Sequence, residues 1–252
     1  MELFDSHCHL TDRTHIACLD EIIKRANNNG VKYLLTAGLN IKDSEACLTI
    51  ANKYHDTYCS VGIHPHDAKM MHEVDTKRLE QLASNPKVKA IGETGLDFYR
   101  NYSDRTSQEK AFHMQIELAQ QLAMPLIIHI RSAYPEAKSI LLQHNYFNGV
   151  LHCYSGDELF AHWAINQGFY ISFSGSITYN NSQLKNIAQK IPENRIMIET
   201  DAPYLTPQPL RGKRNEPSYV KYTAQAIAQL RNCPIEYIAE ITTQNAKQLF
   251  KI

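Results

Sequence analysis

The chain has 252 residues, with 26 lysines and arginines against 26 aspartates and glutamates. This balance argues against binding of nucleic acid through the net charge of the protein, although a local basic loop could still bind it. The 6 cysteines include no Cys-x-x-Cys pair, which favours reduced thiols in a cytoplasmic enzyme over disulfides. The N-terminal residues lack the basic and apolar regions of a signal peptide, and no apolar run is long enough for a membrane span. We therefore expect a soluble cytoplasmic protein without membrane contact.

Short apolar runs, rich in β-branched and aromatic residues, recur along the chain and predict buried strands. Their near-continuous apolar character indicates burial on both faces, as in a parallel sheet. The runs cover residues 2–5, 33–38, 58–63, 89–93, 125–130, 149–153, 170–175 and 195–200.

Amphipathic stretches separate these runs and predict helices. Two are well marked: residues 104–122 carry an apolar stripe, and residues 15–29 end at Asn-Asn-Asn-Gly, a common helix exit. Further helices are predicted at 43–53, 75–84, 134–145, 157–167 and 180–190, with two more in 216–250. Repeated strand–helix units favour a single-domain (β/α)8 TIM barrel over residues 1–252. A doubly wound open sheet is the alternative, weakened because no Gly-rich phosphate motif follows the first run.

Titratable side chains lie at the carboxyl ends of the predicted strands, where (β/α)8 enzymes carry their chemistry. They are His7, His9, His64, Glu93, His129, His152 and Asp201. In an extended backbone, residues two apart point the same way, so His7 and His9 would aim at one point. Imidazoles suit zinc or manganese, and carboxylates also admit magnesium. Apart from His66, the histidines outside this set are expected to be solvated, namely His15, His55, His72, His113, His144 and His162.

The ligand candidates exceed what one tetrahedral ion with an open position needs, so the pattern predicts a centre of two divalent ions, Mg, Mn or Zn. A carboxylate can bridge two cations and an imidazole nitrogen cannot, which makes Glu93 the expected bridge. The alternatives are a salt-bridged Glu93 and a hydrogen-bonded core His129. The predicted ligand sets are His7, His9 and Asp201 for one ion, and His129 and His152 for the other.

The chain contains the segments F-D-S-H-C-H-L-T-D, V-G-I-H-P-H, I-G-E-T-G-L-D-F-Y, P-L-I-I-H-I-R, G-V-L-H-C-Y-S-G, I-S-F-S-G and I-E-T-D-A-P-Y-L-T-P, followed by R-G-K-R-N-E-P. With these segments, between residues 4 and 217, it closely resembles the TatD family of metal-dependent deoxyribonucleases, within the amidohydrolase-like barrels. The resemblance implies a (β/α)8 barrel, a divalent-metal centre and hydrolysis of DNA phosphodiesters, commonly from a 3′ end. It also implies the metal ligands His7, His9, Glu93, His129, His152 and Asp201.

Three catalytic residues are predicted: Asp201, Glu93 and His64. Asp201 is the expected general base, because it can ligate an ion and accept the proton of the attacking water. His64 is expected to contact the scissile phosphate or protonate a leaving oxygen, and a site contact of His66 is left open. Glu199 is expected to hydrogen-bond a ligand, with an ordinary ion pair as the alternative.

Substrate contacts are predicted from two kinds of side chain. Arg131, Arg211 and Arg214 are expected to bind phosphate, with a salt bridge or a solvated face as the alternatives. Aromatic residues near strand ends are candidates for stacking on unpaired bases, although most are expected to be packing residues. These aromatics are Phe98, Tyr99, Tyr154, Tyr179 and Tyr204.

The leading functional hypothesis is a divalent-metal-dependent deoxyribonuclease acting 3′ to 5′ on single-stranded DNA ends, with no obligate protein partner. One alternative is an amidohydrolase-type enzyme that cleaves a C–N or ester bond, including aminoacyl-tRNA deacylation. Better-known two-metal members of that group bridge their ions with a carbamylated lysine, whereas Glu93 occupies the fourth strand here. Another alternative is a non-catalytic nucleic-acid or metal-binding protein, which the full ligand set disfavours.

Overall fold

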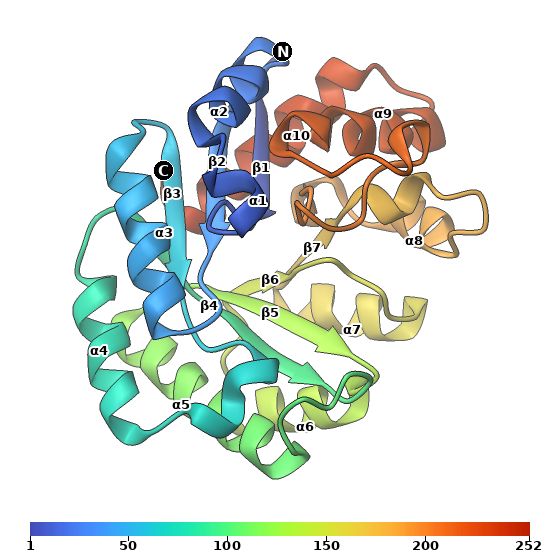
Figure 1. Ribbon diagram of the computed structural model, residues 1–252. Coiled ribbons are helices and arrows are strands. Elements are labelled where there is room, and N and C mark those ends of the chain that lie inside the picture. Colours follow the sequence, from blue (N-terminus) through green and yellow to red (C-terminus); the bar gives the residue numbers. More distant parts are fainter.

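The computed structural model describes residues 1–252, and its strands form one eight-stranded parallel sheet in chain order (Figure 1). The sheet with its surrounding helices confirms the predicted (β/α)8 barrel. The strands are β1 (Leu3–Cys8), β2 (Val31–Ala37), β3 (Thr57–Val61), β4 (Val88–Asp97), β5 (Leu126–Arg131), β6 (Gly149–Leu151), β7 (Tyr170–Phe173) and β8 (Ile196–Ile198).

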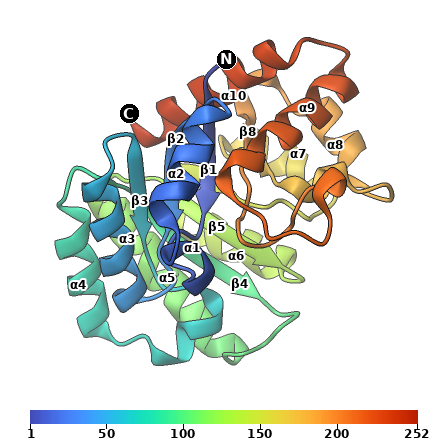
Figure 2. The same cartoon turned by 45° about the horizontal axis from the view of Figure 1, so that its top comes forward.

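The helices surround the sheet, as Figures 1 and 2 show. Side-chain caps set several of their starts: the carboxylate of Asp104, for example, accepts the N–H of Ser107 where α5 begins. None of the helices combines the length and the apolar character needed to cross a bilayer. The helices are α1 (Arg13–Ile16), α2 (Leu19–Asn28), α3 (Ile41–Lys53), α4 (Glu73–Ala83), α5 (Arg105–Leu122), α6 (Tyr134–His144), α7 (Glu158–Gln167), α8 (Leu184–Lys190), α9 (Val220–Arg231) and α10 (Ile235–Phe250).

The barrel closes between β8 and β1 through separate hydrogen bonds rather than a regular ladder. Ser6 Oγ donates to the carbonyl of Ile198 at 2.8 Å. The backbone N–H of Asp201 donates to the carbonyl of His7 at 3.0 Å. This seam therefore brings the first and last strand ends, which both carry predicted ligands, into contact.

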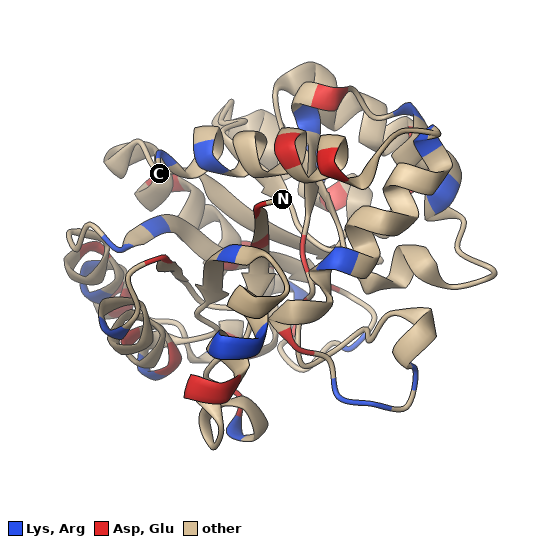
Figure 3. Cartoon of the chain, turned by 90° about the horizontal axis from the view of Figure 1, so that it is seen from above, with Lys and Arg blue, Asp and Glu red and all other residues tan.

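The amino-terminal half of the barrel interior is filled by large apolar side chains. Phe4, Ile127, Tyr170 and Met197 belong to one buried cluster there. Phe250 of α10 joins it, with its ring centroid 6.0 Å from that of Phe4. This cluster closes the amino-terminal end of the barrel, opposite the end at which (β/α)8 enzymes carry their active sites. In the view of Figure 3, basic and acidic residues are interspersed along the chain, as the balanced composition predicts.

Two predicted boundaries were wrong in ways that bear on the site. β1 runs on to Cys8, so His7 lies within the strand, and β4 runs on to Asp97, so Glu93 does not end it. The segment Thr94–Asp97 pairs with Ile128–Arg131 after a register shift. Its Gly-Leu-Asp sequence is typical of turns, and only pairing with β5 keeps it extended.

Candidate metal centre

His7, His9 and Asp201 form one group at the β1–β8 seam, named site A. The two Nε2 atoms of the histidines lie 3.3 Å apart. Asp201 Oδ1 lies 3.3 Å from His9 Nε2 and 3.9 Å from His7 Nε2. Asp201 adopts a left-handed backbone with φ 56°, which aspartate tolerates better than most residues.

His64, His129 and His152 form a second group, named site B, at the carboxyl ends of β3, β5 and β6. His129 Nδ1 and His152 Nε2 lie 3.2 Å apart. His64 enters the same group, because a nitrogen of each of the three rings lies within 3.2 Å of one oxygen of Glu93. The sequence predicted His64 as a phosphate contact, whereas the structure also places it among the candidate ligands.

Glu93 stands between the two groups and directs one carboxylate oxygen toward each. Oε2 lies 3.3 Å from His7 Nε2 in site A. Oε1 lies 2.9 Å from His152 Nε2 and 3.1 Å from His129 Nδ1 in site B. The side chain is buried, yet Oε2 has no hydrogen-bond partner. This is the placement expected of a carboxylate that bridges two cations.

The carboxylates of the centre keep their charge. Burial opposes the ionised form of Glu93, but the imidazoles of His152, His64 and His7 outweigh it and hold the pKa of this carboxyl well below its usual range. The pKa of Asp201 is also lowered, because the hydrogen bond and the charge of His9 outweigh burial. Both groups can therefore serve as anionic ligands at neutral pH.

The imidazoles divide according to their neighbours. Burial lowers the pKa of His64 to about 4 and also lowers that of His7, where His152 adds to the effect. Burial acts in the same direction on His9, but Asp201 and Glu93 outweigh it and raise the pKa to about 9. Carboxylates likewise raise the pKa values of His129 and His152 against burial. With a pKa of about 9, His9 carries a proton at pH 7 in the metal-free protein.

The side chains of the centre fit divalent cations. They form three overlapping groups whose ligand atoms all lie within 4.8 Å of one another. Each group joins imidazole nitrogens to a carboxylate oxygen, which is a donor set for zinc, manganese and similar ions. The groups are His7–His9–Asp201, His7–Glu93–His152 and His64–Glu93–His129.

The sequence model of the TatD related DNase family matches residues 4–251. The chain belongs to this family. It is 40% identical to the uncharacterized metal-dependent hydrolase YabD of Bacillus subtilis, with 99% of each chain covered. It is 34% identical to the 3′-5′ ssDNA/RNA exonuclease TatD of Salmonella typhimurium, again with 99% of each covered. The crystal structure of YJJV, a TatD homologue from Escherichia coli, superposes with a TM-score of 0.92 at 26% identity, covering 99% of this chain and 98% of that one. This TatD-family chain is thus a metal-dependent hydrolase.

Glu199 lies behind site B, buried below the centre. Its Oε1 lies 3.3 Å from His152 Nδ1 and can accept a hydrogen bond from that nitrogen. The hydrogen bond orients the ring so that Nε2 faces Glu93. This is the contact that the sequence predicted for it.

Asp97, which sequence reasoning missed, supports site B from the other side. Its Oδ2 accepts a hydrogen bond from His66 Nε2 at 2.8 Å and lies 3.6 Å from His129 Nε2. Burial opposes its charge, but these two imidazoles outweigh it and lower the pKa of the carboxyl. The four-residue spacing of Glu93 and Asp97 on one face of an extended strand is the signal that could have found it.

Asp5 is a second missed residue, and it ties β1 to the segment after β8. Its Oδ1 accepts the N–H of Thr200 at 2.8 Å, and Oδ2 accepts the hydroxyl of the same residue. Burial raises the pKa of Asp5 well above its usual value. The signal here was the alternation of Asp5, His7 and His9, which places all three on one side of the chain.

His15 was expected to be solvated, and this was wrong. The ring is 1% exposed. Its Nδ1 lies 3.0 Å from the carbonyl of His9, and its Nε2 lies 2.9 Å from the carbonyl of Asn215. His15 Nε2 reaches the carbonyl of Asn215 only because the loop after β8 folds over α1, which is a contact between segments far apart in the sequence. His15 thereby braces the backbone of His9.

The three predicted phosphate-binding arginines are exposed and form no ion pair with a carboxylate. The guanidinium of Arg131 lies 4.2 Å from the ring centroid of Tyr99, and that of Arg211 lies 4.5 Å from that of Tyr179. Arg214 lies on the loop that follows Arg211. Stacking on a ring leaves the N–H groups at the edge of a guanidinium open to an anion.

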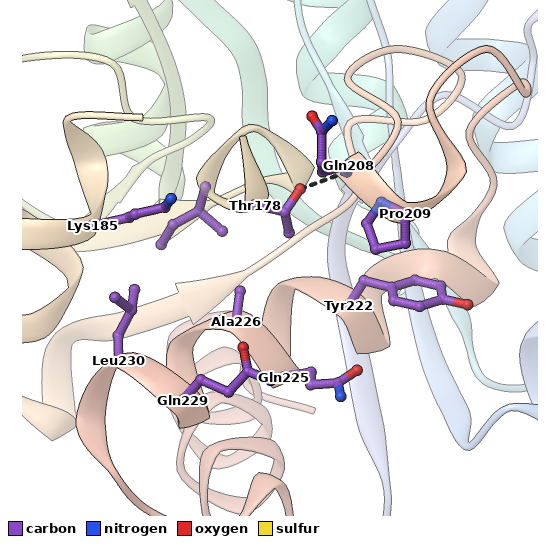
Figure 4. A pocket seen from close by; sticks show the side chains of 10 residues that line it. Thr178, Lys185, Gln208, Pro209, Tyr222, Gln225, Ala226, Gln229 and Leu230 are labelled. Carbon is purple, nitrogen blue, oxygen red and sulfur yellow. Dashed lines mark hydrogen bonds between the residues drawn. The ribbon is translucent and has the colours of Figure 1, made fainter. Parts of the chain in front are cut away.

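A hollow of about 480 Å³ lies elsewhere, on the outer side of the barrel (Figure 4). It opens between α8, α9 and two short 3-10 helices, η2 (Gly175–Thr178) and η4 (Gln208–Leu210). A hydrogen bond from the N–H of Gln208 to Thr178 Oγ1 joins its walls. No histidine, cysteine or carboxylate lines it, so it offers none of the side-chain types that form sites A and B.

Proposed function

We propose that this TatD-family chain hydrolyses phosphodiester bonds of single-stranded DNA from the 3′ end, with two divalent ions bound at sites A and B. The observation that carries the proposal is the position of Glu93, which offers one oxygen to each site. Relatives at 34% identity that are named 3′-5′ ssDNA/RNA exonuclease support the choice of substrate.

In this proposal His7, His9 and Asp201 hold one ion and His129 and His152 the other, with Glu93 between them. Divalent cations so held would acidify a water molecule and offset the charge of the reacting phosphate. Glu199 and Asp97 keep the imidazoles of site B in orientation through their outer nitrogens.

Asp201 is the proposed general base. It is ionised at neutral pH because its pKa is lowered. Its side chain is 14% exposed, whereas that of Glu93 is 3% exposed, so water reaches Asp201 more readily. Since Oδ1 faces His9, the remaining oxygen is left to take a proton from the attacking water.

His64 is proposed to touch the scissile phosphate through Nε2 or to share the ion of site B. A pKa of about 4 leaves its ring neutral at pH 7. A neutral ring favours hydrogen bonding or ligation over the donation of a proton to a leaving oxygen. Arg131, Arg211 and Arg214 are proposed to hold neighbouring phosphates of the strand.

The test is digestion of a 5′-labelled single-stranded oligodeoxynucleotide with magnesium, manganese or zinc, beside an EDTA control. Glu93→Gln keeps the shape of the side chain and removes the bridging charge, and Glu158→Gln on the exposed surface of α7 is the matched control. We expect a ladder that shortens from the 3′ end, lost with EDTA and with Glu93→Gln only. No cleavage by the wild-type protein with any of these ions would overturn the proposal and direct the search to ester and amide substrates, aminoacyl-tRNA among them.

A further inference from the structure

Three tyrosines at the mouth of the barrel expose large aromatic rings. Tyr99 is 62% exposed, Tyr102 is 58% exposed and Tyr204 is 56% exposed. The sequence predicted Tyr99 and Tyr204 as stacking candidates but not Tyr102. Two further candidates are engaged elsewhere: Tyr154 is buried, and the hydroxyl of Tyr179 donates to the carbonyl of Thr206. The structure thus separates candidate stacking residues from packing residues.

These rings belong to opposite sides of the mouth. Tyr99 and Tyr102 follow β4, and Tyr204 follows β8. β4 and β8, both labelled in Figure 2, stand four positions apart in the eight-stranded order. Because the barrel closes between β8 and β1, such strands face each other across its axis.

Contacts connect the rings to opposite ends of the metal centre. The ring centroid of Tyr204 lies 5.9 Å from that of His9 in site A. The ring centroid of Tyr102 lies 4.7 Å from that of His66, which in turn lies 4.3 Å from that of His64 in site B. A strand whose reacting phosphate lies at Glu93 would therefore meet an aromatic ring in each direction.

Hydrogen bonds hold the backbone of Tyr204 and of Tyr99 in place. The N–H of Tyr204 donates to the carbonyl of Asp201 at 2.9 Å, and the carbonyl of Tyr204 accepts Asn215 Nδ2. The N–H of Tyr99 donates to Asp97 Oδ1 at 2.9 Å, and Arg131 covers one face of its ring. Each ring also packs against one neighbour, His9 for Tyr204, His66 for Tyr102 and Arg131 for Tyr99, and a side chain that is already restricted loses less conformational entropy when a flat partner stacks on it.

We propose that Tyr204 stacks the base on one side of the scissile phosphate and that Tyr102, extended by Tyr99, stacks the base on the other side. The proposal rests on the nuclease function proposed above. The ligand is then a single strand that crosses the metal centre with at least one unpaired base on each side. Unpaired bases are needed because bases within a duplex offer no free face to a tyrosine side chain.

The test combines tyrosine variants with missing bases. Steady-state kinetics would be measured for the wild-type protein, Tyr204→Ala, Tyr204→Phe and Tyr102→Ala on single-stranded oligonucleotides. The substrates carry all bases, or an abasic sugar at the last or at the next-to-last position from the 3′ end. Tyr237→Ala is the matched control, because Tyr237 is 38% exposed but lies on α10, away from the mouth.

Loss of one stacking ring is expected to raise KM for the intact strand about 5- to 150-fold. Tyr204→Phe, which keeps the ring, should remain near wild type, as should Tyr237→Ala. Once a tyrosine is replaced by alanine, removal of the base that it stacks on should not raise KM any further. The abasic position that shows this behaviour should differ between Tyr204→Ala and Tyr102→Ala.

Three results would overturn the proposal in distinguishable ways. If wild-type protein with bound metal cleaves no strand, the nuclease function and the stacking proposal both fail. If it cleaves strands but ring loss and base loss are additive, the stacking contacts fail and the nuclease function stands. If both tyrosines respond to the same abasic position, the arrangement on two sides fails. Equal metal content in all variants guards against misfolding.

Discussion

Replacing Gly95 by alanine tests how closely β4 must approach β5 beside the metal centre. Gly95 pairs with His129 across these strands, and its φ of 126° is one that residues with a Cβ rarely adopt. A Cβ built on Gly95 would lie 2.0 Å from the carbonyl oxygen of His129. The clash is with backbone, so no side-chain rotation can relieve it.

The magnitude follows from two costs. The unfavourable backbone conformation costs roughly 1–2 kcal/mol, and forcing an extra carbon into a filled site costs about 1–3 kcal/mol. Together they predict that Gly95→Ala lowers the free energy of unfolding by roughly 2–5 kcal/mol. Since the strand that must move carries His129, site B should also lose metal affinity.

Gly212→Ala is the matched control. Gly212 has a φ of 89°, but a Cβ there would meet nothing within 4 Å. Gly212→Ala should therefore lower the free energy of unfolding only by the cost of the backbone conformation, about 1–2 kcal/mol, and leave metal binding unchanged. Urea unfolding of the metal-free proteins, followed by circular dichroism, and metal content after dialysis measure the two effects. Equal unfolding midpoints for Gly95→Ala and Gly212→Ala would refute the close approach of β4 to β5.

Three further predictions concern the ligands and the core. Asp97→Asn should weaken metal binding at site B about 10- to 100-fold and leave site A unchanged, as measured by chelator competition; equal loss at both sites would contradict its contact with His129. Because the pKa of His9 is raised to about 9, its ring is protonated at pH 7 without metal, so zinc binding should release a proton. Calorimetry in buffers of different ionisation enthalpy would detect this, and identical heats would argue against it. Phe250→Ala should lower the free energy of unfolding by about 3–5 kcal/mol in urea titrations while metal stoichiometry stays the same, since Phe250 plugs the end opposite the centre.

The sequence alone determined the barrel and the ligand candidates. Runs such as 125–130 are apolar because they are buried on both faces, and that requirement acts within a few residues of chain. His7, Glu93 and Asp201 were found in the same local way, as polar groups at or near the ends of apolar runs. The structure then brought the predicted ligands within reach of one another.

Tertiary structure decided the contacts between these local units. β4 stays extended beyond Glu93 through pairing with β5, against the turn preference of its own sequence, and this places Asp97 beside site B. His15 is buried only because Asn215 and the loop after β8 fold over it. Tyr102 and Tyr204 lie across the mouth from each other because β4 and β8 are opposite in a closed sheet. The hydrophobic pattern of a segment shows which of its side chains are buried, because that pattern is local. Contacts between residues far apart in the sequence depend on how the whole barrel closes, and no single segment contains that information.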